Sequence, residues 1–306
     1  MKFVALIKYR NMSRLLTLLF VTLIGLTNLF GQSDSSQVTK KYQAKPKSVY
    51  PFGKEAFLKD EKTTIRWLGN AGFLINSRGT RVMIDPMLKE FDMPVLFDAP
   101  VATSDIPELD AVLITHSDND HYSIPTCKDL SKVTKAFHST IYVDSLIKNE
   151  GWNSFGHAIS DEFIVGNINI KVTPADHQWQ NAYPGFAKRF FRKEDCAGFF
   201  MTTVDGTIWA TGDSKLMPEH FDLPNPDVIL FDISDSEWHF TVKGALQLAE
   251  RYPDALLICS HWGTVDAPDF TPFNGDPEII KAQIKNPNRL MVLSPGESFI
   301  LTKSKK

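Results

Sequence analysis

Four side chains of the types that bind metal ions lie within six residues of this sequence: His116, Asp118, Asp120 and His121. They directly follow residues 110–115, a short β-branched run typical of a buried strand. Alternate residues of an extended chain point to the same side, so the first three of these side chains would face one site. His121 would reach the same site from the following turn. Imidazole and carboxylate ligands together suit zinc, iron or manganese.

Four more candidates are spread along the chain: His177, Asp213, His239 and His261. All but His239 follow a strand-like run, and these runs cover residues 168–173, 207–211 and 255–260. In layered α/β folds, catalytic groups gather at the ends of strands. The spacing therefore predicts that these distant residues share the site of the 116–121 segment.

The order of these residues resembles the signature of the metallo-β-lactamase superfamily of metal-dependent hydrolases. That signature is His-x-His-x-Asp-His, followed by a distant His, a bridging Asp and a last His, and the resemblance extends over residues 63–302. It implies two divalent metal ions, with zinc as the first expectation. The first metal would be held by His116, Asp118 and His177, and the second by Asp120, His121 and His261, with Asp213 bridging the two.

Asp118 departs from the family pattern, which has a second His at this position. Its carboxylate adds hard oxygen character and negative charge, which would favour iron or manganese over zinc, or leave the first metal site weakly held. The family's flavodiiron branch carries a Glu here and binds iron. Alternatively, Asp118 is not a ligand and accepts a hydrogen bond from a histidine that is.

The resemblance also implies a chemistry. Two cations about 3.5–4 Å apart bring the pKa of a shared water toward neutrality and so supply hydroxide. Asp120 would orient that hydroxide, and His239 would donate a hydrogen bond to the developing oxyanion. The expected reaction is hydrolysis of an ester, lactone or phosphodiester. For His239, a surface or helix-capping histidine is the alternative.

The segment from Trp67 to Ile75 and the Ile84-Asp85-Pro86 triplet resemble the opening of the lactonase and N-acyl-phospholipase-D-like branches. In this comparison Asp85 would lie at a strand end beneath the metals. A turn-initiating Asp before Pro is its alternative role.

Two other functions fit the same residues. One is a di-iron redox protein, which Asp118 suggests, although flavodiiron enzymes need a flavin domain for which this chain has neither the length nor a flavin loop. The other is a non-catalytic exported binding protein with a degenerate metal site. Iron content with redox activity would favour the first, and the absence of turnover would favour the second.

The elements that must position these residues read as an α+β fold. Residues 63–68, 72–75 and 81–84 predict a β-meander, and 163–165 with 168–173 and 195–203 with 207–211 predict two hairpins. A helix is expected over 124–133 and a strand over 140–143. Residues 228–232, 241–251 and 255–260 predict strand, helix and strand, and the last strands fall at 290–293 and 298–301. The whole predicts a four-layer αββα sandwich, the metallo-β-lactamase fold, as one domain over residues 56–306.

Composition excludes some partners. The chain has 306 residues, is 43% hydrophobic and carries a net charge of −3 without a basic block, so nucleic acid is not an expected partner. The three cysteines show no pairing pattern, and Cys259 is expected to be a buried structural thiol. No oligomeric state follows from the sequence.

The first 31 residues predict a cleaved secretory signal, since a basic start precedes an apolar run from Leu15 to Leu26. That run is shorter than the roughly 20 residues of a spanning helix, which makes a membrane anchor the second choice. Residues 32–55 are polar and predict a flexible lead-in, so the protein is expected to be periplasmic or secreted. The irregular segment 87–109 is a predicted substrate loop. The aromatic, basic segment 178–193 predicts a small-molecule or lipid-like substrate, or contact with a membrane surface.

Overall fold

The computed structural model describes residues 42–183, 185 and 189–303. The signal predicted for residues 1–31 lies outside this range. Of the predicted lead-in, residues 42–55 run along the domain, where Gln43 bonds to the backbone of Val265 and Ala267, and Tyr50 N donates to Pro295 O at 2.8 Å. None of the helices in the described residues combines the length and apolarity needed to cross a bilayer.

The first sheet has the strand order β14-β1-β2-β3-β4-β5-β6. Its strands are β1 (Thr63–Gly69), β2 (Gly72–Ser77), β3 (Thr80–Ile84), β4 (Ala111–Ile114), β5 (Phe137–Thr140), β6 (Ser154–His157) and β14 (Ser298–Ile300). Neighbours from β14 to β3 are antiparallel, and those from β3 to β6 are parallel. The predicted meander is confirmed.

The second sheet has the order β13-β12-β11-β10-β9-β8-β7. Its strands are β7 (Glu162–Val165), β8 (Ile168–Pro174), β9 (Ala197–Thr203), β10 (Gly206–Ala210), β11 (Val228–Asp232), β12 (Leu256–Ser260) and β13 (Leu290–Met291). Both predicted hairpins form, and β10 to β13 are parallel. The second hairpin turns at Val204 and Asp205, one residue before the predicted Asp205-Gly206 pair, because Gly206 already pairs with Thr203. The carboxyl ends of parallel strands therefore meet at one edge of each sheet.

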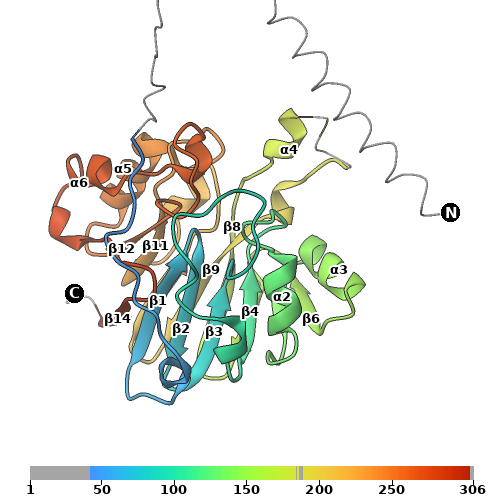
Figure 1. Ribbon diagram of the computed structural model, residues 1–306. Coiled ribbons are helices and arrows are strands. Elements are labelled where there is room, and N and C mark those ends of the chain that lie inside the picture. The colour runs from blue at the N-terminus through green and yellow to red at the C-terminus, as the bar shows by residue number, and fades with distance from the viewer. Residues whose placement is uncertain (1–41, 184, 186–188, 304–306) are drawn as a thin grey trace, which may run out of the picture. The chain divides into compact units, whose positions relative to one another are not determined.

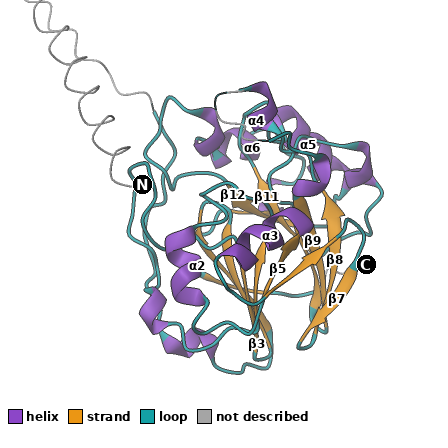
Figure 2. Ribbon diagram, turned by 90° about the vertical axis from the view of Figure 1, so that its right-hand side faces the viewer, coloured by secondary structure: helices purple, strands orange, loops and turns teal. Residues whose placement is uncertain are grey.

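Strict alternation along the strands builds the layers. In β2, Phe73 and Ile75 belong to the core between the sheets, whereas Leu74 belongs to a separate core beneath helices. Those helices are α2 (Ile124–Leu130) and α3 (Ile141–Asn149), which lie beside the first sheet in Figures 1 and 2. Helix α5 (Thr241–Arg251) covers the second sheet with Leu248 and its neighbours, and α6 (Pro277–Lys281) lies next to it. The four-layer αββα prediction is confirmed.

The strand predicted over residues 140–143 is wrong. Ile141, Tyr142 and Val143 begin α3, because Thr140 caps the helix by accepting a hydrogen bond from Val143 N at 3.4 Å. Val143 and Ile147, one turn apart, are then both buried against the first sheet. The strand of this region, β5, lies three residues earlier. Short 3-10 helices occupy several connections: Lys54–Phe57, Thr103–Asp105, Lys193–Asp195, Pro218–Phe221, Thr271–Phe273 and Pro287–Arg289.

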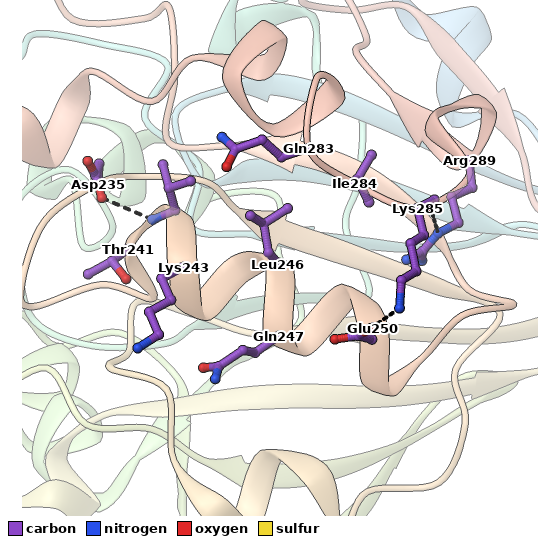
Figure 3. Close-up of a pocket in the computed structure, with 11 residues that line it drawn as sticks. Asp235, Thr241, Lys243, Leu246, Gln247, Glu250, Gln283, Ile284, Lys285 and Arg289 are labelled. Atoms are coloured by element: carbon purple, nitrogen blue, oxygen red, sulfur yellow. Dashed lines mark hydrogen bonds and ion pairs between the residues drawn. The ribbon is translucent and has the colours of Figure 1, made fainter.

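An open groove of about 570 Å³ runs along the outer side of α5 (Figure 3). Its walls include Leu246 from α5 and Ile284 from the segment that follows α6, and Glu250 and Lys285 form an ion pair across it. None of the eight predicted site residues lines this groove. It is a separate surface feature.

Candidate metal centre

The structure brings all eight predicted site residues together. They come from loops that follow the carboxyl ends of β4, β8, β10, β11 and β12, which carry the 116–121 segment, His177, Asp213, His239 and His261 in turn. Seven of the eight residues are buried, and the side chain of Asp118 is 15% exposed. Residues as far apart as His116 and His261 thus share one enclosed polar site.

One group of ligand atoms is formed by Asp120, His121, Asp213 and His261. His121 Nε2 lies 3.2 Å from His261 Nε2, 3.3 Å from Asp120 Oδ2 and 3.1 Å from Asp213 Oδ2. Asp213 Oδ1 lies 2.8 Å from His261 Nε2, yet without the alignment of a hydrogen bond. Two ring nitrogens and two carboxylates that face one another this closely are arranged as ligands of a cation.

A second group shares Asp213 and adds His116 and His177. Asp118 Oδ2 lies 3.3 Å from His116 Nε2 and 3.4 Å from His177 Nε2, while His177 Nε2 is 3.8 Å from Asp213 Oδ2. His239 borders both groups, with its Nε2 atom 3.8 Å from Asp213 Oδ2. Asp213 therefore lies between the two groups, where a bridging carboxylate is expected.

The outward nitrogen of each imidazole is fixed by a hydrogen-bond partner. The Nδ1 atoms of His121 and His239 lie 2.8 Å from carboxylate oxygens of Asp85 and Asp232. Those of His116, His177 and His261 face Thr115 Oγ1, Trp238 O and Pro272 O at 3.1, 2.8 and 3.2 Å. This pattern is typical of metal-ligating histidines, since it leaves Nε2 directed inward.

The spacing of the inward atoms also fits a cation. Zinc bound tetrahedrally at about 2.0–2.1 Å requires ligand atoms roughly 3.3–3.4 Å apart. The contacts of His121 and of Asp118 described above lie near this value. His116 Nε2 is buried and has no hydrogen-bond partner among the described residues, and a cation would satisfy such an atom.

Comparison with known proteins identifies the family of this chain. The family described as the beta-lactamase superfamily domain matches residues 80–262, more than half of the chain. The chain belongs to the metallo-β-lactamase superfamily. It is a metal-dependent hydrolase of this fold.

Relatives of this metallo-β-lactamase superfamily member include a protein of Methanopyrus kandleri described as a UPF0173 metal-dependent hydrolase. It is 26% identical over 245 residues, which are 77% of this chain and 98% of the relative. Among solved structures, a metallo hydrolase from Ignicoccus hospitalis has a TM-score of 0.61 at 19% identity, covering 78% of this chain and 98% of that one. An isothiocyanate hydrolase from Delia radicum gut bacteria has a TM-score of 0.64 at 17% identity, covering 78% and 99%.

Charge in the centre of this metallo-β-lactamase fold is balanced between imidazoles and carboxylates. Burial lowers the pKa of His121, but the carboxylates of Asp213, Asp120 and Asp85 outweigh it and raise that pKa well above its usual value. Burial likewise opposes, and Asp213 drives, a rise in the pKa of His261 to about 9. The same pairing holds the pKa of Asp213 well below its usual range despite burial. Divalent cations would replace the protons that these imidazoles otherwise carry.

Three residues that support the centre were missed or left open by sequence reasoning. Asp85 accepts hydrogen bonds from Thr115 N at 2.8 Å and Thr115 Oγ1 at 2.6 Å as well as facing His121, so it is part of the site rather than only a turn. Asp232 ends β11, and the strand-end rule that found Asp213 would have found it too. Asn70 donates from Nδ2 to Asp120 Oδ2 at 2.9 Å.

Three residues at the metal centre have strained backbone conformations. Asn70, Asp85 and His261 have φ values of 47°, 41° and 58°, in the left-handed region that non-glycine residues rarely adopt. Asn70 and His261 are joined by a hydrogen bond from His261 N to Asn70 O at 3.1 Å. The fold therefore holds the supporting residues in conformations that they would not adopt alone.

Proposed function

We propose that this protein hydrolyses an ester, lactone or phosphodiester with a water molecule activated by two divalent cations. The observation that carries the proposal is the convergence of five imidazoles and three carboxylates on one buried site with Asp213 between two ligand groups. The lactonase and N-acyl-phospholipase-D-like branches are the part of the superfamily that we propose for this chain.

We assign Asp120, His121 and His261 to one cation and His116, His177 and Asp118 to the other, with Asp213 shared. When bound, the cations would supply Lewis acidity and bring the pKa of a water molecule toward neutrality. We propose zinc as the resident metal because imidazole supplies four of the ligands. Iron and manganese are the alternatives, since Asp118 contributes a hard oxygen.

The chain's own groups hold and move protons around that water. Asp120, fixed by Asn70, would accept a hydrogen bond from the attacking water and so orient it. His239 donates its Nδ1 proton to Asp232, so its Nε2 atom carries a proton only in the imidazolium form. In that form, His239 would donate from Nε2 to the oxyanion that develops on the substrate.

The proposed substrate is a small molecule with an apolar or lipid-like part. In the aromatic segment 178–193, Tyr183 and Phe190 are 48% and 73% exposed, whereas Arg189 is paired with Asp195 and stacks on Tyr142. Lys188 of this segment lies outside the described residues. The exposed rings support contact with an acyl chain or a membrane surface. Co-sedimentation with lipid vesicles, reduced in Phe190→Ser, would test this contact.

We propose export to the periplasm or out of the cell for a mature protein that begins after the predicted signal. The support for this comes from the sequence of residues 1–31 alone. N-terminal sequencing of the protein recovered from cell fractions tests it. An intact N-terminus in the membrane fraction would support the anchor instead.

The reaction is tested with a panel of lactone, phosphodiester and acyl-ester substrates, run together with elemental analysis. Turnover of one class should disappear in His121→Ala and in Asp213→Ala, together with metal. His138→Ala, which changes a half-buried histidine outside the site, should keep both. Full activity in either site variant would refute the mechanism. Iron with redox turnover would support the di-iron alternative. One or no bound metal per chain, without turnover, would support a binding role.

A further inference from the structure

Asp118 is held between two kinds of neighbour. On one side, its Oδ2 and Oδ1 atoms accept hydrogen bonds from Trp179 Nε1 and Gln180 Nε2, both at 2.6 Å. On the other, Oδ2 faces the Nε2 atoms of His116 and His177. Building on the proposed metal centre, we propose that Trp179 and Gln180 are positioning residues that aim the Asp118 carboxylate at the cation held by His116 and His177.

The lone pairs of the carboxylate decide this assignment. Each carboxylate oxygen offers about two lone pairs. Because the indole N–H and the amide N–H each occupy one, on different oxygens, the carboxylate can rotate neither about its own axis nor away from the site. The remaining lone pair of Oδ2 is left toward the two imidazole nitrogens, at the 3.3 and 3.4 Å separations expected between ligands of one cation.

The orientation of the Gln180 amide follows from the same contact. Gln180 is 5% exposed, and its Oε1 atom has no hydrogen-bond partner among the described residues. Exchanging its oxygen and nitrogen would set two oxygens against each other at 2.6 Å, which is repulsive. The amide therefore donates to Asp118, and that hydrogen bond is its main polar contact.

Trp179 and Gln180, which together form a clamp on Asp118, belong to the same segment as the proposed ligand His177. Trp179 and Gln180 open helix α4 (Trp179–Ala182), two and three residues after His177. The helix is fastened at its other end, where Asn181 Nδ2 donates to Phe191 O at 2.8 Å and Phe191 N donates to Asn181 Oδ1 at 2.9 Å. Asp118 is thus oriented by the same stretch that carries His177, which explains how a carboxylate serves at a position where the family has histidine.

The proposal predicts a loss confined to one of the two cations. Trp179→Phe keeps the ring and removes the N–H, and Gln180→Leu keeps the size and removes the donor. Loss of such a supporting hydrogen bond typically weakens metal affinity by about 10–100-fold. In a zinc titration against a chromophoric chelator, each variant should therefore show one weakened binding step and one unchanged step. The double variant should retain one zinc ion per chain after dialysis.

Matched substitutions elsewhere control for folding. Trp152→Phe changes a tryptophan stacked on Phe137, and Gln247→Leu changes an exposed glutamine of α5, so both should bind zinc as the unchanged protein does. If both zinc-binding steps are unchanged in the double variant, the proposed role of Trp179 and Gln180 is wrong. If both steps weaken equally, the two residues support the fold in general and do not position Asp118. The proposed function itself would fail in a different way: the wild-type protein would bind fewer than two ions per chain or would hydrolyse none of the substrates.

Discussion

Replacing Asp85 by asparagine should weaken His121 as a metal ligand, although His121 itself is unchanged. The carboxylate of Asp85 lies 2.8 Å from His121 Nδ1 and keeps a proton there, so that the neutral imidazole offers Nε2 to a cation. In the Asp85→Asn variant, the new amide would keep its oxygen on Thr115 N and turn its NH₂ group toward the imidazole. His121 would then accept at Nδ1 and carry its proton on Nε2, where a cation must bind.

The size of the effect follows from what is lost. Supporting carboxylates of this kind are worth about 10–100-fold in metal affinity, which corresponds to about 1.4–2.7 kcal/mol. His121 Nε2 lies within 3.3 Å of ligand atoms of Asp120, Asp213 and His261. The loss of affinity should therefore fall on the cation that this group would hold. The step assigned to His116 and His177 should be much less affected.

The assay is a zinc titration with a competing chelator, together with hydrolysis of the best substrate. Asp227→Asn is the matched control, because Asp227 Oδ2, directly before β11, accepts from Thr207 N at 2.8 Å and Thr207 Oγ1 at 2.9 Å, and Asp227 is not one of the predicted site residues. It should lose comparable folding stability and no metal affinity. Wild-type zinc affinity in Asp85→Asn would refute the tautomer argument.

Three further outcomes are expected. His239→Gln should lower kcat by about 10²–10³-fold while two metal ions remain bound, and a change in KM alone would remove its role as oxyanion donor. Asn70→Gly, which tolerates the left-handed backbone and removes only the amide, should weaken metal binding or turnover by about 10-fold, and unchanged kinetics would show that Asp120 needs no support. The hydrogen bond from Arg78 lowers the pKa of Asp205 to about 2 from its ordinary 3.8, so the stability that it contributes is complete above pH 4 and lost as pH falls toward 2. Urea unfolding of Asp205→Asn should show a deficit of about 1 kcal/mol at pH 7 that closes near pH 2, and a deficit independent of pH would contradict this assignment.

Much of the fold was predictable because local patterns and tertiary packing agree. The turn residues Gly69–Gly72 predict the pairing of β1 with β2, and the Asp205-Gly206 signal predicts the pairing of β9 with β10, although the turn itself lies at Val204 and Asp205. The segment from residue 140 misled because its β-branched residues favour a strand locally. The cap at Thr140 and the burial of Val143 and Ile147 together outweigh that preference.

The site residues were predictable where they followed strands, and so was Asp232, but the other groups that support them were not. Asn70 contacts Asp120 across 50 positions, and Trp179 and Gln180 contact Asp118 across 61 and 62. No local sequence pattern predicts such contacts, because each depends on how two loops meet in space. Asp85 illustrates the difficulty, since Asp before Pro has a sufficient local explanation as a turn.

Elemental analysis of the purified protein after dialysis tests the central claim most directly. Convergence of the two ligand groups on Asp213 predicts two divalent ions per chain, falling below one in Asp213→Ala together with loss of hydrolysis. Full hydrolysis by a chain that retains no metal would contradict the account.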